Sequence, residues 1–433
     1  MSSSLDLPKP TGEVNRILCL DALRGFALLG ILLLNIIGFG LLSPSYSNPA
    51  FDLADSGTSS LVAWAIIELI AEGAMRALFS ILFGAGVMLF VTGVRAKSAW
   101  THYKRTFWLL LIGLFDAYIL LWNGDILVTY AIAGALLYLV RNQSAKTLFV
   151  MASVLIILMS ALHGATQFSL KLSYDASQRV ALARADGQAT SMSKEDLALA
   201  AGWEDFIKDF TLSPEGSLQE TAQRTESYNS VLDWTAYKNA EIYGFILPVF
   251  LLWDALAMMI IGMGLYKKGV LQAQRHNRFY INLMATGFSI GLLTNGFEVV
   301  NAIQSNFDIF STFAQMQFTY HIGRLGMALG YIGLFGWLCT ASLLEGFIQR
   351  LAAVGRMALT NYLMHSLICA VLFTGLGFGL LGHFERIELY AIVASIWLFQ
   401  VWLSPIWLSK FKFGPVEWVW RALTYNTLPD FKR

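Results

Sequence analysis

The chain has 433 residues and a formal net charge of +1; 56% of its residues are hydrophobic and only 14% are charged. The charges lie between apolar runs of about 20 residues, the length of a helix that crosses a bilayer. These runs lack the alternation of barrel strands. We therefore predict an all-α, polytopic integral membrane protein, with the lipid bilayer as a partner and no nucleic-acid partner.

The first apolar run, residues 16–39, carries two charges. Asp21 and Arg24 are three residues apart, so they share one face of a helix and can pair there. A charge at the centre of a spanning helix costs roughly 2.5–3.5 kcal/mol, and such residues usually face protein or water. We expect this polar membrane pair to face protein, either to hold the helix in its bundle or to serve the function.

The membrane pattern occurs in two halves around a polar stretch. Residues 166–240 are charged, Ala-rich and amphipathic, which indicates a soluble helical insertion. Five spans are predicted on either side of it, about ten in all. The predicted parts are a cytoplasmic N-terminal segment, the first membrane half, the extracytoplasmic insertion, the second half and a cytoplasmic amphipathic C-terminal segment: 1–15, 16–165, 166–240, 241–409 and 410–433.

Basic residues occur in only one set of the short loops. The loops at 95–105, 141–146, 267–278, 345–356 and 410–433 hold Lys or Arg, whereas 43–60, 123–125 and 302–317 hold none. Because cytoplasmic loops carry the excess of Lys and Arg, both termini are predicted in the cytoplasm and the insertion outside. The cysteines lie in apolar runs without paired spacing, so we expect neither a disulfide framework nor a metal site.

The positions of glycines predict one helix break and one close helix contact. Gly73 predicts a break within the long apolar stretch 61–94. In the eighth predicted span four glycines recur at intervals of three and four: Gly323, Gly326, Gly330 and Gly333. Such a small-residue face lets another helix approach closely.

Five motifs, in order along nearly the whole chain, resemble those of YeiB-type bacterial membrane proteins. They are Arg16, Asp21, Arg24-Gly25 and Asn35; Leu78-Phe79-Ser80 with Leu82-Phe83-Gly84-Ala85-Gly86; Gly124-Asp125-Ile126-Leu127 with Tyr130; Gly355-Arg356-Met357-Ala358-Leu359-Thr360-Asn361-Tyr362; and a tail from Phe413 to Tyr425. The opening motif is also similar to one in the superfamily of transmembrane acyltransferases, which includes the lysosomal heparan glucosaminide acetyltransferase. The resemblance implies a bacterial plasma-membrane protein with an acyltransferase-like core, which moves an acyl group from a cytosolic donor to an extracytoplasmic sugar or envelope acceptor.

Two positions depart from these relatives. The acetyltransferase relative has an essential histidine in the loop after this first helix, whereas residues 42–60 contain none. YeiB-type relatives often have a histidine where this chain has Asp116. An imidazole base would therefore have to come from elsewhere in the chain.

Acyl transfer requires a base for the acceptor, a group that stabilises the oxyanion, and cations for the donor phosphates. His321 lies one turn before Arg324 and is the first candidate base. Asp125 and His163 are further catalytic candidates on the same, outer side. On the inner side, the candidates to hold acetyl-CoA or another acyl-CoA are Arg24, Arg105, Arg356 and Asn361. A helix cap for Asp125, an interfacial anchor for His321 and the positive-inside bias for the loop arginines stay open as alternatives.

Two other functions stay open as well. Asp116, Asp254 and His365 fall near mid-span, where a proton-coupled carrier places ionisable groups. The motifs of the two halves do not correspond, so no inverted repeat supports a carrier. A non-catalytic assembly or sensing protein would use the insertion and the tail as interaction surfaces. The sequence leaves open the acceptor, the acyl group and the oligomeric state, a homo-oligomer included.

Overall fold

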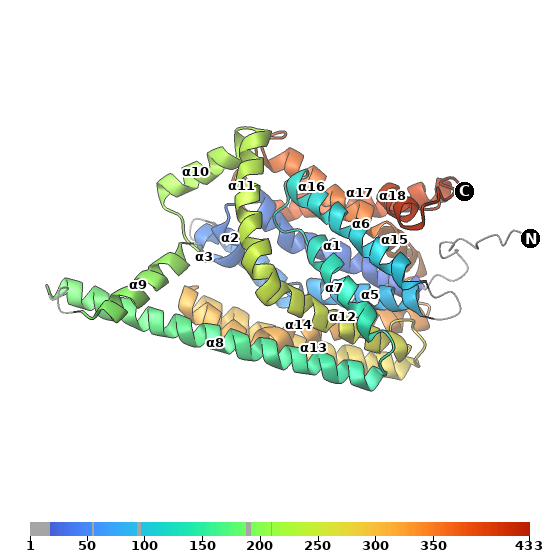
Figure 1. The fold of residues 1–433 in the computed structure, drawn as a ribbon, viewed down its shortest axis with the longest axis horizontal. Coiled ribbons are helices and arrows are strands. Elements are labelled where there is room, and N and C mark those ends of the chain that lie inside the picture. Colours follow the sequence, from blue (N-terminus) through green and yellow to red (C-terminus); the bar gives the residue numbers. More distant parts are fainter. Residues whose placement is uncertain (1–17, 54–55, 93–96, 188–191, 209) are drawn as a thin grey trace, which may run out of the picture.

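The computed structural model describes residues 18–53, 56–92, 97–187, 192–208 and 210–433 (Figure 1). The N-terminal segment 1–15 and Arg16 lie outside these residues. The helices are α1 (Leu18–Gly40), α2 (Pro44–Ser47), α3 (Ala50–Leu53), α4 (Thr58–Ile70), α5 (Ala74–Val91), α6 (Ala99–Tyr118), α7 (Leu127–Val140), α8 (Ala145–Ala185), α9 (Lys194–Ile207), α10 (Pro214–Thr225), α11 (Tyr228–Glu241), the π-helix η3 (Ile242–Leu251), α12 (Leu252–Lys267), α13 (Asn277–Gln304), α14 (Ile309–Thr340), α15 (Glu345–Arg356), α16 (Ala358–Phe373), α17 (Arg386–Lys410) and α18 (Pro415–Tyr425). Apart from one isolated β-bridge, the regular structure in the described ranges is helical, which confirms the all-α prediction.

Several helices have the length and apolar composition of membrane spans. Among the described residues, 7 helices pass this test, or up to 8 if α15 and α16, which meet at 76°, form one bent span. Two of the ten predicted spans fall short: α7 has only 14 residues, and α6 carries Lys104, Arg105 and Asp116. The chain is therefore a multi-pass membrane protein, and the count of ten stays a prediction.

Helix α1 lies at the centre of the bundle, where it contacts α5, α14, α15, α16 and α17 (Figure 1). Its apolar residues, such as Leu28, Leu32 and Ile36, have no exposed surface. Replacing one of these leucines by alanine typically costs about 2–5 kcal/mol, because a cavity remains in the packed interior. This helix therefore positions the elements that surround it.

Glycines set the closest helix contacts. Gly73 has a φ of +62° and separates α4 from α5, at the break that the sequence predicted. The glycine face of α14 packs on α13, where a Cβ on Gly326 would lie 2.8 Å from the amide nitrogen of Gly291. Because no side chain fits there, the backbones of the two helices approach directly.

The predicted insertion is helical but is not separated from the membrane helices. Helix α8 continues without a break across the boundary predicted at 165, and α11 continues through η3 into α12 across the one predicted at 240. Between them, α10 docks on the end of α1: Arg224 donates to the carbonyls of Gly38 (2.8 Å) and Leu41 (2.9 Å) and pairs with Glu220 at 3.0 Å. The arginine thereby satisfies carbonyls that the last turn of a helix leaves unpaired.

Candidate functional site

The three arginines predicted to hold the donor line one cavity of about 230 Å³, here called the arginine cavity. Arg24, Arg105 and Arg356 face it from α1, α6 and α15, and Arg421 joins them from α18. Its aromatic lining comprises Phe79, Phe83, Phe90, Tyr130, Tyr362, Trp420 and Tyr425. Arg24 also donates to Asp21 at 2.9 Å, the contact that their spacing predicts.

The C-terminal helix α18 forms one wall of the arginine cavity. Trp420 lies 4.4 Å from the Arg105 guanidinium carbon, and its indole nitrogen donates to the Arg105 carbonyl at 2.9 Å. Glu417 accepts from the amides of Leu359 (2.6 Å) and Thr360 (3.0 Å) and so caps the start of α16. Burial raises the pKa of Glu417 above its ordinary value. Sequence reasoning named this tail as a motif but did not assign it to the site.

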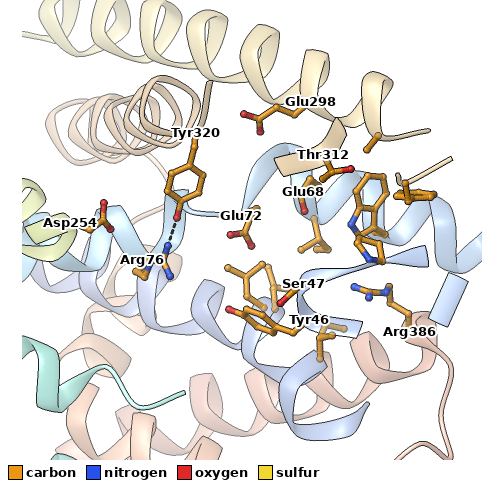
Figure 2. A pocket seen from close by; sticks show the side chains of 18 of the residues that line it. Tyr46, Ser47, Glu68, Glu72, Arg76, Asp254, Glu298, Thr312, Tyr320 and Arg386 are labelled. Atoms are coloured by element: carbon orange, nitrogen blue, oxygen red, sulfur yellow. Dashed lines mark hydrogen bonds between the residues drawn. The ribbon is translucent and has the colours of Figure 1, made fainter. Parts of the chain in front are cut away.

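A second cavity, of about 360 Å³, is called the carboxylate cavity because Glu68, Glu72 and Glu298 line it (Figure 2). Figure 2 shows these side chains with Tyr46, and with Arg76, which contacts the Tyr320 hydroxyl. His163, one of the predicted catalytic residues, also lines this cavity. Glu68 and Glu72 have an i, i+4 spacing that is common on any helix surface, and Glu298 is distant in the sequence, so only the fold brings the three together.

A third cavity, of about 440 Å³, adjoins the carboxylate cavity and is called the Asp125 cavity. The two share lining residues, among them Glu72, Arg76 and Asp254. Asp125 is 5% exposed and stands in the turn before α7, where its Oδ2 accepts from the Val128 amide at 2.9 Å. Burial, the largest cause, raises the pKa of Asp125 to about 7. The residue thus caps a helix and also faces a cavity as a carboxylate poised near neutral pH.

His321 and Arg324 lie together, as their spacing predicts, but in a closed ion-pair cluster. Arg324 donates to Asp254 at 2.6 Å and to Nδ1 of His321 at 2.6 Å. Because an arginine cannot accept, Nδ1 accepts and the imidazole proton sits on Nε2. Nε2 is buried and has no partner among the described residues. In this arrangement His321 has no lone pair left for an acceptor proton, and the ion pair of Arg324 with Asp254 links α14 to α12.

Tyr130 lies between two of the cavities, because it lines both the arginine cavity and the Asp125 cavity. Its hydroxyl lies 2.6 Å from the Ser80 hydroxyl, which faces the Asp125 cavity. A second connection runs through Tyr362, which lines the arginine cavity and donates to Asp125 over a long 3.5 Å. Sequence reasoning missed both tyrosines as site residues, since a tyrosine in an apolar run looks like core.

The remaining candidates do not form a group. Asp116 is fully buried, close to Asp125 and Ser366. His365 bonds to Gln400 at 2.9 Å, and Asn361 donates to Val354 and Ser404. The three mid-span residues considered for a carrier, Asp116, Asp254 and His365, therefore have three different settings.

Comparison with known proteins gives relatives but no activity. The family model described as Protein of unknown function (DUF418) matches residues 265–427. The chain is 33% identical over 423 residues to the uncharacterized protein YeiB of Escherichia coli (strain K12), covering 95% of this chain and 97% of that protein. It is 27% identical over 433 residues to the uncharacterized protein YxaH of Bacillus subtilis (strain 168), covering 96% of each. No solved structure matches the chain.

Proposed function

The chain belongs to the DUF418 family of YeiB-like membrane proteins, and from that premise we propose that it is an acyltransferase of the bacterial plasma membrane. The donor is a coenzyme A thioester that enters the arginine cavity. The acceptor, a sugar or envelope hydroxyl or amine, enters the Asp125 cavity. The observation that supports this proposal is the shared wall: Tyr130 lines both cavities, so the acyl end of the donor and the acceptor lie against the same side chain.

The residues of the arginine cavity suit the donor. Guanidinium groups bind phosphate oxygens through paired hydrogen bonds, and four arginines line this cavity. Aromatic rings such as Trp420 offer faces on which an adenine can stack. Under the positive-inside rule the basic end of the bundle faces the cytoplasm, where coenzyme A thioesters are made. Both chain termini then also lie in the cytoplasm.

The reaction requires one base, and Asp125 is the predicted catalytic residue that lines the acceptor cavity, whereas His163 lines the carboxylate cavity. The acceptor oxygen or nitrogen gives its proton to the Asp125 carboxylate and attacks the thioester carbonyl. The carbon–sulfur bond then breaks, and the thiolate takes up the proton to leave free coenzyme A. Tyr362 lines the donor cavity and contacts Asp125, and its hydroxyl can turn from Asp125 to the developing oxyanion once Asp125 has taken up the proton.

Donor binding tests the proposal. Purified protein should bind coenzyme A in a calorimetric titration, and Arg356→Gln should weaken binding by about 1.5–3 kcal/mol, the value of a hydrogen bond to a charged group. Arg350→Gln is the matched control, since Arg350 is exposed on the same helix and outside the arginine cavity. Melting curves establish that each variant is folded. Equal affinity in all three proteins would remove Arg356 from the site, and no binding by the wild type would reject the donor.

One observation favours a proton-coupled carrier as the second candidate. Asp254 lines both the carboxylate cavity and the Asp125 cavity. Its carboxylate interacts with Arg324 and Arg76. In a carrier, Asp254→Asn should abolish pH-driven flux into proteoliposomes, whereas Asp125→Asn should leave it intact. Acyl transfer without such flux would decide for the enzyme.

A further inference from the structure

We infer that Tyr130 closes the inner end of the donor site and restricts the protein to short acyl groups. This inference rests on the proposed function, because it concerns the same donor cavity. It adds the class of donor, a short-chain acyl thioester, and the residue that sets it.

Helix α5 gives a depth scale for the donor site. Near its end, Phe90 lies 4.8 Å from the Arg105 guanidinium carbon, and one turn deeper Arg24 lies beside Gly86. Deeper still, Phe83 contacts the ring of Tyr130, and Ser80 contacts its hydroxyl. At 1.5 Å per residue, Phe90 and Ser80 are roughly 15 Å apart along the axis. A donor whose phosphates bind the arginines and whose chain follows α5 into the cavity would therefore meet Tyr130 with its thioester end.

Tyr130 is held in place on several sides. It is 2% exposed, its hydroxyl lies 2.6 Å from that of Ser80, and it also donates to the Arg76 carbonyl at 3.4 Å. Its ring stacks on Phe79 at 5.8 Å and meets Phe83 edge-on at 5.2 Å. A side chain with both its hydroxyl and its ring engaged does not move aside for an alkyl chain without losing these contacts.

Space lies directly behind this side chain. The Asp125 cavity, about 440 Å³, begins at Tyr130, Ser80 and Thr129. Replacing the ring by a methyl group would join this cavity to the arginine cavity of about 230 Å³. A long alkyl chain excluded by the wild-type tyrosine would then enter the enlarged space and bury its methylene groups, which favours binding.

The test compares the affinities of coenzyme A, acetyl-, butyryl- and octanoyl-coenzyme A for the wild type, Tyr130→Ala, Tyr130→Leu and Tyr130→Phe. In the wild type, octanoyl-coenzyme A should bind at least tenfold more weakly than acetyl-coenzyme A. Tyr130→Ala and Tyr130→Leu should reduce this ratio to less than threefold, and Tyr130→Phe should retain it. Tyr138→Ala, two turns further along α7 and outside the arginine cavity, is the matched control and should behave as the wild type.

Two kinds of failure can be separated. Coenzyme A binding with no chain-length preference in the wild type, or with the same preference in Tyr130→Leu, would overturn the role of Tyr130 and leave the proposed function standing. No binding of unacylated coenzyme A to the folded wild type would overturn both. The alanine and leucine variants remove the ring to different extents, so the leucine variant carries the test if the alanine variant does not fold.

Discussion

Gly25 and Gly355 pack backbone against backbone where α1 meets α15: a Cβ on Gly355 would lie 2.7 Å from the amide nitrogen of Gly25 and would collide with the Asp21 carbonyl. Each glycine adjoins an arginine of the arginine cavity, Arg24 on one side and Arg356 on the other. Just after Gly355 the chain bends by 76° between α15 and α16. This single contact therefore brings two arginines from opposite ends of the sequence into one cavity.

The first prediction concerns this contact. Gly25→Ala and Gly355→Ala should each destabilise the protein by about 1–3 kcal/mol, because the added methyl group forces the two backbones apart. Gly346→Ala is the control, since Gly346 lies on the same helix with nothing within 4 Å of the new methyl group. Thermal melting in detergent measures the effect. Equal melting temperatures for Gly355→Ala and Gly346→Ala would contradict the prediction, because they would show that α1 and α15 can move apart without loss of stability.

The features of the fold that depend on residues close together in the sequence could be predicted. Apolar runs predicted the helices, and Gly73 predicted the break before α5, because both depend on local chain chemistry. The glycine face of α14 predicted close packing, although its partner, α13, could be identified only in three dimensions. The boundaries predicted at 165 and 240 fall inside continuous helical segments. A helix can leave the membrane without any signal in the sequence except a gradual change in polarity.

The site was predictable in part. The arginines could be grouped because the sequence assigns them to one end of the bundle, Arg24 near the start of the first span and Arg105 and Arg356 at basic loops. The structure places all three on one cavity. The spacing of His321 and Arg324 could not predict that Asp254, 70 residues away, would hold the arginine and thereby fix the imidazole. Tyr130 lies in an apolar run of the sequence, and only the fold places a cavity on either side of it.

The second prediction tests orientation. Cysteines at Ser59 and Gln304, both exposed, should react with a membrane-impermeant thiol reagent added to intact cells, whereas one at Gln274 should react only after lysis. The basis is the concentration of Lys and Arg in the loop that holds Gln274. Of the three native cysteines, Cys19 and Cys369 are buried and Cys339 is partly buried, so the wild type is labelled in parallel as the background. Labelling of Gln274→Cys in intact cells would invert the arrangement and place the arginine cavity outside.

The third prediction concerns the buried pair of Asp254 and Arg324. Asp254→Asn should destabilise the protein by about 3–5 kcal/mol, because it leaves the guanidinium of Arg324, which is 1% exposed, without its counter-charge. The double variant Asp254→Leu/Arg324→Met should lose less, since neither charge remains buried. Additive losses in the double variant would show that the two side chains act independently.

The last prediction assigns the base. If Asp125 takes the acceptor proton, Asp125→Asn should reduce turnover by about 100-fold to 10,000-fold and leave coenzyme A binding unchanged. A carboxylate acts as a base only when it is deprotonated, and burial raises the pKa of Asp125 to about 7. The wild-type rate should therefore rise with pH through about 7, and the residual rate of Asp125→Asn should not follow this profile. His321→Gln should cost less than about tenfold, because Nδ1 of His321 already accepts from Arg324. An acyl-transfer assay on the three folded proteins decides: a rate lost in His321→Gln and kept in Asp125→Asn would return the base to the histidine.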